Sequence, residues 1–141
     1  MDRNIDAKLI FFYRAPISNC KPEKEMSLRE IHDFIKNGRS GIVIKLRGIK
    51  DEKEARSYKA SKFDHCTFSG IFTHRKEDGL VQHSGLLCLD FDHLDDVESV
   101  FQKLISDPRC PTALLFRSPS GDGLKWVVPI DVEQMSHEDW F

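Results

Sequence analysis

The apolar residues of the chain follow two different spacings, and each spacing predicts one kind of element. Apolar side chains that alternate with polar ones, or that form short continuous runs between turn residues, are typical of β-strands. Such segments predict strands at residues 8–13, 41–47, 66–72, 86–92, 112–118 and 124–130. The last two are joined by "PSGDG", whose turn residues favour a hairpin.

Apolar residues three and four positions apart predict helices elsewhere. The segment 27–38 carries a capping box of Ser27 and Glu30 at its start and Gly38 at its end. Residues 97–105 form the clearest amphipathic pattern, with Asp95 or Asp96 as its cap and a proline after it. The sequence also predicts a helix at residues 51–63 and a last helix that begins after the serine at position 136.

The order of these elements predicts an α+β fold. We expect a single domain over residues 1–141, with a mixed or antiparallel sheet whose helices cover one face and whose other face is open for a site. The chain stops about one turn into its last predicted helix. We therefore expect a piece of a longer protein, with a core that continues past Phe141.

The strand at 86–92 carries two acidic residues, Asp90 and Asp92, inside an apolar run. Residues two apart in a strand face the same side, so Leu87, Leu89 and Phe91 face one side and the two aspartates face the other. Two neighbouring carboxylates repel each other on a partly desolvated face. A bound Mg²⁺ or Mn²⁺ removes that conflict; the alternative is that one aspartate ends the strand and accepts hydrogen bonds from turn amides.

The turn "SPSGDGLK" is a second candidate for chemistry. Glycines at 121 and 123 allow successive backbone N–H groups to converge on an anion, and a nearby lysine adds positive charge. The candidate nucleotide-binding residues are Ser118, Ser120, Gly121, Gly123 and Lys125. The alternative is a plain hairpin turn followed by a surface lysine.

Charge is distributed unevenly along the chain, although the net charge is only −2. Residues 39–62 hold eight Lys and Arg against three acids, and residues 77–141 hold four against thirteen. A basic segment suits a polyanion, and a solvated surface is the alternative. The candidate nucleic-acid contacts are Lys45, Arg47, Arg56 and Lys59.

No apolar run reaches membrane-spanning length, so we expect a soluble, cytoplasmic protein without a membrane partner. The four cysteines stand far apart, which favours reduced, buried thiols. A zinc site of Cys66 or Cys88 with His65 or His83 is the alternative, but its spacing matches no standard zinc finger.

Residues 40–132 resemble the VirE N-terminal domain family, which is similar to the archaeo-eukaryotic primase, or primase-polymerase, superfamily. The resemblance is carried by "GLLCLDFDHL" and "LLFRSPSGDGLKWVVPI". It implies an RRM-like primase-polymerase core. Asp90 and Asp92 match the acidic motif of the superfamily, and Ser120, Gly121 and Gly123 match its S-G-x-G motif.

The resemblance implies a DNA replication-related nucleotidyltransferase of a mobile element or phage, with a helicase as a fused partner. Asp90 and Asp92 would bind Mg²⁺ or Mn²⁺ and, with Lys125, form the catalytic set acting on a nucleoside triphosphate and a nucleic acid template. Two departures from the pattern stand out. Lys125 takes the position of the usual histidine, and the third acid of the pattern has no clear match: Asp131 is a weak candidate, and the alternative is an acid past Phe141.

Two other functions fit the same residues. In the first, the domain is a catalytically inactive nucleic-acid-binding or docking module beside a helicase, and the two departures favour it. In the second, "LDFDHL" is the nucleophile strand of a phosphatase similar to haloacid dehalogenases. That motif requires Thr or Val where Leu94 stands, and few residues follow it, so this function ranks last.

Overall fold

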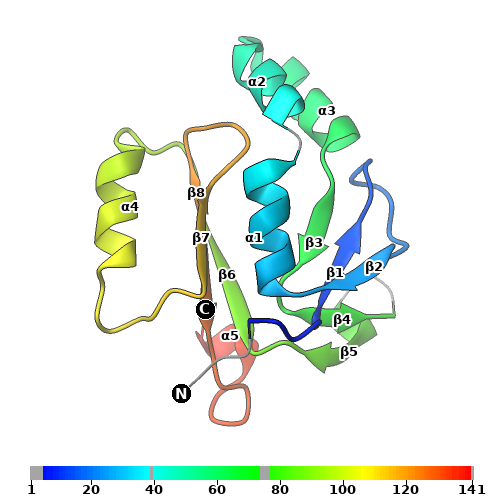
Figure 1. The fold of residues 1–141 in the computed structure, drawn as a ribbon, viewed down its shortest axis with the longest axis vertical. Helices are drawn as coiled ribbons and strands as arrows, with labels where there is room; N and C mark the ends of the chain where they lie inside the picture. Colours follow the sequence, from blue (N-terminus) through cyan, green and yellow to red (C-terminus); the bar gives the residue numbers. More distant parts are fainter. Residues whose placement is uncertain (1–4, 39, 74–76, 141) are drawn as a thin grey trace. The chain divides into compact units, whose positions relative to one another are not determined.

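The computed structural model describes residues 5–38, 40–73 and 77–140. The chain divides into two compact units, residues 1–84 and 85–141, and each is described by itself (Figure 1). Helices and antiparallel strand pairs occur in the chain, so the predicted α+β class is confirmed. The strands form three separate sheets, with the orders β2-β1-β3, β4-β5 and β6-β8-β7, in place of the one sheet that we expected.

The first unit is built on β1 (Ile10–Tyr13), which lies between β2 (Lys24–Met26) and β3 (His65–Thr67). Phe11 belongs to both registers, opposite Glu25 on one side and Thr67 on the other. Ile10, Phe12 and Tyr13 are all buried, so this short strand supplies much of the core of the unit. The predicted strand at 8–13 is confirmed, whereas β2 was not predicted.

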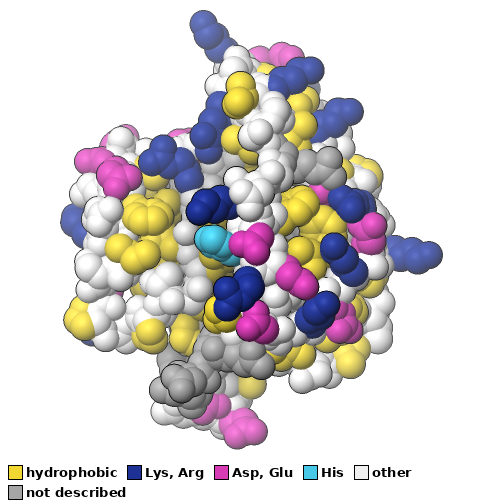
Figure 2. All heavy atoms as spheres, viewed as in Figure 1, with side chains coloured by type: hydrophobic (Ala, Val, Ile, Leu, Met, Phe, Trp, Pro, Cys, Tyr) yellow, Lys and Arg dark blue, Asp and Glu magenta, His cyan; other side chains and the backbone are white. Residues whose placement is uncertain are grey.

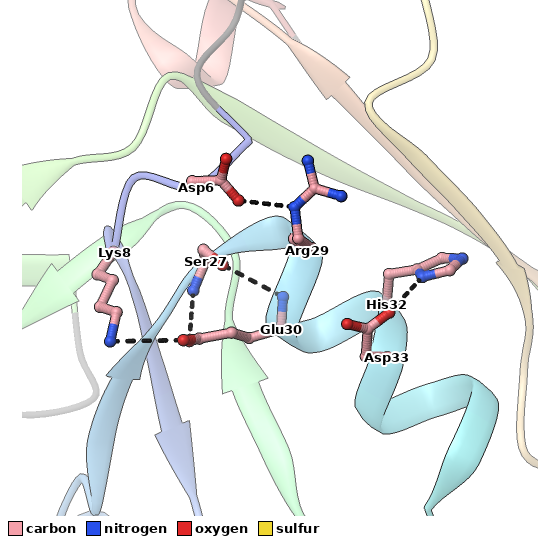
Figure 3. Close-up of polar contacts among 7 residues, drawn as sticks. All are labelled: Asp6, Lys8, Ser27, Arg29, Glu30, His32 and Asp33. Atoms are coloured by element: carbon pink, nitrogen blue, oxygen red, sulfur yellow. Dashed lines mark hydrogen bonds and ion pairs between the residues drawn. The ribbon is translucent and has the colours of Figure 1, made fainter.

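Helix α1 (Leu28–Asn37) begins at the predicted capping box (Figure 3). The Glu30 amide donates to Ser27 Oγ at 3.2 Å, and the Ser27 amide donates to Glu30 Oε2 at 3.1 Å. These two bonds satisfy amides that have no partner within the helix. Lys8 forms an ion pair with Glu30 at 3.4 Å, which ties the segment before β1 to the helix start.

Helix α2 (Ser40–Gly48) occupies the segment for which we predicted a strand at 41–47, and that prediction was wrong. The run of β-branched residues at 42–44 favours a strand by composition. Its burial, however, has helical spacing: Leu46 is buried, and Ile42, Val43 and Ile49 are half-buried. Positions i, i+1, i+4 and i+7 lie on one side of a helix, whereas a strand would place them on both faces.

Helix α3 (Glu52–Lys62) follows after three residues and confirms the predicted helix at 51–63. Its cap is Asp51, whose Oδ1 accepts a hydrogen bond from the Glu54 amide at 2.8 Å. The Lys45 ammonium lies 5.5 Å from the centre of the Tyr58 ring, so α2 and α3 are in contact through a cation–π pair. We call α2 and α3 together, residues 40–62, the basic hairpin.

The strand predicted at 66–72 is two strands, β3 and β4 (Gly70–Phe72), separated by a turn. Gly70 has a φ of 153°, and a Cβ there would lie 2.1 Å from the Gln82 carbonyl oxygen. The chain therefore turns where only glycine fits, and β4 pairs with β5 (Leu80–His83). A short 3₁₀ turn, η1 (Glu77–Gly79), precedes β5; neither it nor β5 was predicted.

The second unit is a three-stranded antiparallel sheet with β8 (Leu124–Pro129) between β6 (Leu86–Phe91) and β7 (Leu114–Arg117). Three predicted strands and the β7–β8 hairpin are thereby confirmed. Helix α4 (Val97–Ile105) is also confirmed, with Asp96 as its cap, and α5 (His137–Trp140) follows the predicted serine.

The core of the second unit lies on one face of this sheet. Leu87, Trp126 and Val128 are buried there, and Leu104 of α4 packs against them. The Trp126 indole N–H donates to Thr112 Oγ1 at 2.8 Å, so the largest side chain of this core has its polar atom satisfied. In the parts of the chain that the structure describes, no helix is long and apolar enough to cross a membrane.

Gly41 provides a test of α2. A Cβ at Gly41 would meet nothing within 4 Å. We expect Gly41→Ala to raise the free energy of unfolding by about 0.5 kcal/mol, because alanine loses less backbone entropy than glycine in a helix. Urea unfolding followed by far-UV circular dichroism measures this change. The control is Gly38→Ala, whose Cβ would lie 2.5 Å from the Phe34 carbonyl oxygen and should destabilise. A destabilising Gly41→Ala would contradict the helix.

Candidate functional site

Asp90 and Lys125 lie side by side on the sheet of the second unit. They are direct partners in the register of β6 and β8, and Lys125 Nζ lies 2.9 Å from Asp90 Oδ1. Leu87 and Leu89 belong to the core face, so Asp90 faces the opposite side, as the strand spacing predicted. Lys125 therefore places a positive charge directly beside the Asp90 carboxylate.

Asp92 lies one residue past the end of β6, and its side chain is exposed. His93 follows with a φ of 53°, in the left-handed region that only a few non-glycine residues adopt. The chain thus changes direction at this point. Asp92 is two residues after Asp90, but the strand that would hold both carboxylates on one face ends at Phe91.

The glycine turn is closed by its own hydrogen bonds. The Gly121 amide donates to the Ser118 carbonyl at 2.9 Å, and the Ser118 amide donates to the Gly123 carbonyl at 2.9 Å. Ser118 is buried and Ser120 is exposed. The Gly121 amide is therefore used within the turn.

Gly123 has a packing role in this turn. A Cβ at Gly123 would lie 2.4 Å from the Phe91 carbonyl oxygen and 3.1 Å from Ser118 Oγ. The turn consequently lies directly against the end of β6. This contact brings Lys125 opposite Asp90, two residues further along the hairpin.

Asp122 and His93 were missed by the sequence analysis. The Leu94 amide donates to the Asp122 carbonyl at 2.8 Å, and His93 Nδ1 lies 3.1 Å from Asp122 Oδ2. These contacts attach the loop after β6 to the glycine turn. A "DG" pair signals only a turn in sequence, and nothing in the spacing of His93 and Asp122 predicts that they meet.

Cys88 lies on the same face as Asp90, with its Sγ 3.9 Å from Asp90 Oδ1. Burial, together with the nearby negative charge of Asp90, raises the pKa of the Cys88 thiol to about 12, although Lys125 opposes the shift. The thiol is therefore protonated at neutral pH, which does not suit a nucleophile.

All four cysteines are free thiols; Cys66, Cys88 and Cys110 are half-buried, whereas Cys20 is exposed, so the predicted burial was wrong for Cys20. Over residues 5–38, 40–73 and 77–140, no three His, Cys, Asp or Glu side chains come together as metal ligands would. Asp131, the candidate third acid, accepts a hydrogen bond from the Glu133 amide at 2.9 Å. Its carboxylate therefore takes part in the turn that follows β8.

The predicted nucleic-acid contacts lie in the first unit, on the basic hairpin. Lys45, Arg47 and Arg56 are exposed, and Lys59 is half-buried. Figure 2 shows several Lys and Arg side chains over the helices that Figure 1 labels α2 and α3. Arg39, which belongs to the same basic run in sequence, lies outside the described residues.

Charge is separated along α3. Its acids are Glu52 and Glu54 in the first turn, whereas Lys59 and Lys62 lie in the last. Both placements are favourable, because a helix carries partial positive charge at its N-terminus and partial negative charge at its C-terminus. Glu52 also pairs with Arg56 at 3.3 Å, an exposed contact of small energetic value. The C-terminal half of α3 is consequently the basic half.

Gly123 provides a test of this geometry. We expect Gly123→Ala to lower the free energy of unfolding by about 2 kcal/mol, because the new Cβ would overlap the Phe91 carbonyl oxygen and force the turn away from β6. Urea unfolding measures the loss. The matched control is Gly48→Ala, where a Cβ meets nothing within 4 Å. Equal stability of the two variants would mean that the turn does not pack on β6.

Comparison with known proteins gives one family match, to the model described as BT4734-like, N-terminal domain, over residues 58–139. No curated protein and no solved structure matches the chain. The match corrects the resemblance to the VirE N-terminal domain family and the primase-polymerase superfamily, since it is a different family. The short motifs behind that resemblance have structural explanations here: Asp90 pairs with Lys125, and Gly121 and Gly123 form a tight turn. The match covers more than half of the chain, which therefore belongs to the BT4734-like N-terminal domain family.

Proposed function

We propose that this chain is a nucleic-acid-binding module and that the basic hairpin makes the contact. The observation that carries the proposal is the concentration of exposed cations on two adjacent helices. They are Lys45, Arg47, Lys50, Lys53, Arg56 and Lys62, with Lys59 half-buried.

The acids of the hairpin do not cancel this charge evenly. Asp51 caps α3, and Glu52 and Glu54 lie in the first turn, so the negative charge is confined to one end of that helix. Phosphate groups of a nucleic acid are neutralised by Lys and Arg side chains, with release of bound counterions. The three-residue connection between α2 and α3 also has the length found in helix-turn-helix units.

The Asp90–Lys125 pair supports binding over catalysis. An ammonium group already compensates the carboxylate that a metal ion would need. The Asp90 carboxylate therefore attracts a divalent cation less strongly than an unpaired carboxylate would. A binding module requires no metal at this position.

The test is fluorescence anisotropy with a labelled oligonucleotide, at salt concentrations between about 50 and 200 mM. The variant replaces Lys45, Arg47, Arg56 and Lys59 with alanine. We expect it to weaken binding by at least about a hundredfold at low salt. The slope of the logarithm of the binding constant against the logarithm of the salt concentration should become shallower by about one for each lost phosphate contact.

The matched control replaces Lys21, Lys24, Lys103 and Arg109 with alanine, which changes the net charge by the same amount outside the hairpin. It should keep most of the affinity. Equal losses in both variants would show only a net-charge effect and would refute the hairpin as the contact surface. A wild-type protein that binds no oligonucleotide would refute the function.

A second candidate is metal-dependent nucleotidyl transfer at Asp90 and Asp92, and the observation in its favour is that Asp90 and Lys125 share one face of the sheet. The donor set fits Mg²⁺ or Mn²⁺ in part: two carboxylates are typical ligands, but the Lys125 ammonium is bonded to one of them. Bound metal would supply charge to polarise a phosphate. In this chain Asp90 and Asp92 would hold it, and Lys125 would contact the nucleotide.

Mn²⁺ titration followed by electron paramagnetic resonance tests this candidate. If the site exists, the wild type lowers the free Mn²⁺ signal and the Asp90→Asn/Asp92→Asn variant does not. Lys125→Ala should then bind Mn²⁺ more tightly, because a competing positive charge is lost. Asp95→Asn, an exposed acid of the same loop, is the control. Wild type and double variant with the same weak binding would eliminate the candidate.

A further inference from the structure

Helix α2 carries an isolated apolar side chain on its exposed side. Ile44 is 72% exposed, the largest exposed fraction among the large hydrophobic residues that are exposed in the described chain. The apolar side of the helix faces elsewhere, because Leu46 is buried and Ile42 and Val43 are half-buried. Ile44 therefore does not belong to the core of the unit.

The face of α2 around Ile44 includes two glycines and the exposed Arg47, which is three residues further along the helix. Gly41 and Gly48 lie three residues before it and four after it, which places all three on one face. A Cβ at either glycine would meet nothing within 4 Å. A ligand backbone can thus approach the helix closely on both sides of Ile44.

Cations lie next to this face in sequence. Lys45 and Arg47 are exposed on α2, and Lys50 is exposed in the turn after it. These cations make the face unfavourable for an apolar protein partner, because they would lose hydration in the complex without gaining a negatively charged partner. It suits a polyanion whose backbone is charged and whose interior is apolar.

We propose that a single-stranded nucleic acid crosses this face of α2 and that Ile44 packs against the face of one of its bases. This inference rests on the proposed nucleic-acid binding and names its substrate class. Base faces are accessible in a single strand, whereas stacking covers them in a duplex. The adjacent cations bind the phosphates, and the glycines leave room for the sugar-phosphate backbone.

The experiment compares a labelled single strand with a duplex of the same length by fluorescence anisotropy. Ile44→Ala should weaken single-strand binding about fivefold, leave duplex binding unchanged and leave the salt slope unchanged, because no charge is lost. Ile44→Phe should strengthen single-strand binding by a similar factor through stacking. Alanine has the higher helix propensity, so Ile44→Ala should keep the fold, which circular dichroism checks.

Ile105→Ala on α4 is the matched control, since Ile105 is also an exposed isoleucine of a helix, at 49%. It should bind both ligands like the wild type. The variant that lacks the hairpin cations Lys45, Arg47, Arg56 and Lys59 separates the two failures. If it loses binding while both Ile44 variants bind like the wild type, the inference about Ile44 fails and the proposed function stands. If it also binds like the wild type, the proposed function fails as well. An equal loss on duplex and single strand in Ile44→Ala would overturn the choice of single strands.

Discussion

The second unit depends on the close contact between the glycine turn and the end of β6. Gly123 lies so near the Phe91 carbonyl that no side chain fits between them, and this contact fixes how β8 runs along β6. The register that follows places Asp90 opposite Lys125 and Leu89 opposite Trp126. One face of the sheet thus becomes a packed apolar core, and the other carries a compensated pair of charges.

Several elements were predictable because a local signal agreed with the tertiary structure. The capping box of α1, the amphipathic pattern of α4 and the turn residues between β7 and β8 each predict their element from a few adjacent residues. Helix α2 was mispredicted because its run of β-branched residues favours a strand, and the helical spacing of its buried residues is visible only in the structure. Strands β2 and β5 are short and mostly exposed, so their sequences carry little strand pattern.

The candidate site shows the same limit at the level of chemistry. Strand alternation correctly placed Asp90 away from the core, but its direct ion pair with Lys125 depends on the register between β6 and β8. The contact of His93 with Asp122 joins residues 29 positions apart, and such contacts depend on the turn geometry. Short motifs with acids and glycines are compatible with both a ligand site and a tight hairpin, and here the internal hydrogen bonds account for the glycines.

The separation of charge along α3 has a consequence for the kinetics of association. A helix with acids at one end and cations at the other creates a directional electric field, which acts on a charged ligand before any contact forms. A polyanion approaching the hairpin would be drawn more strongly toward the Lys59–Lys62 end than toward the Glu52–Glu54 end, where the two acids offset the charge of Lys53. Encounters are thereby pre-oriented, so the field contributes to the rate and the polarity of docking more than to the strength of the final complex.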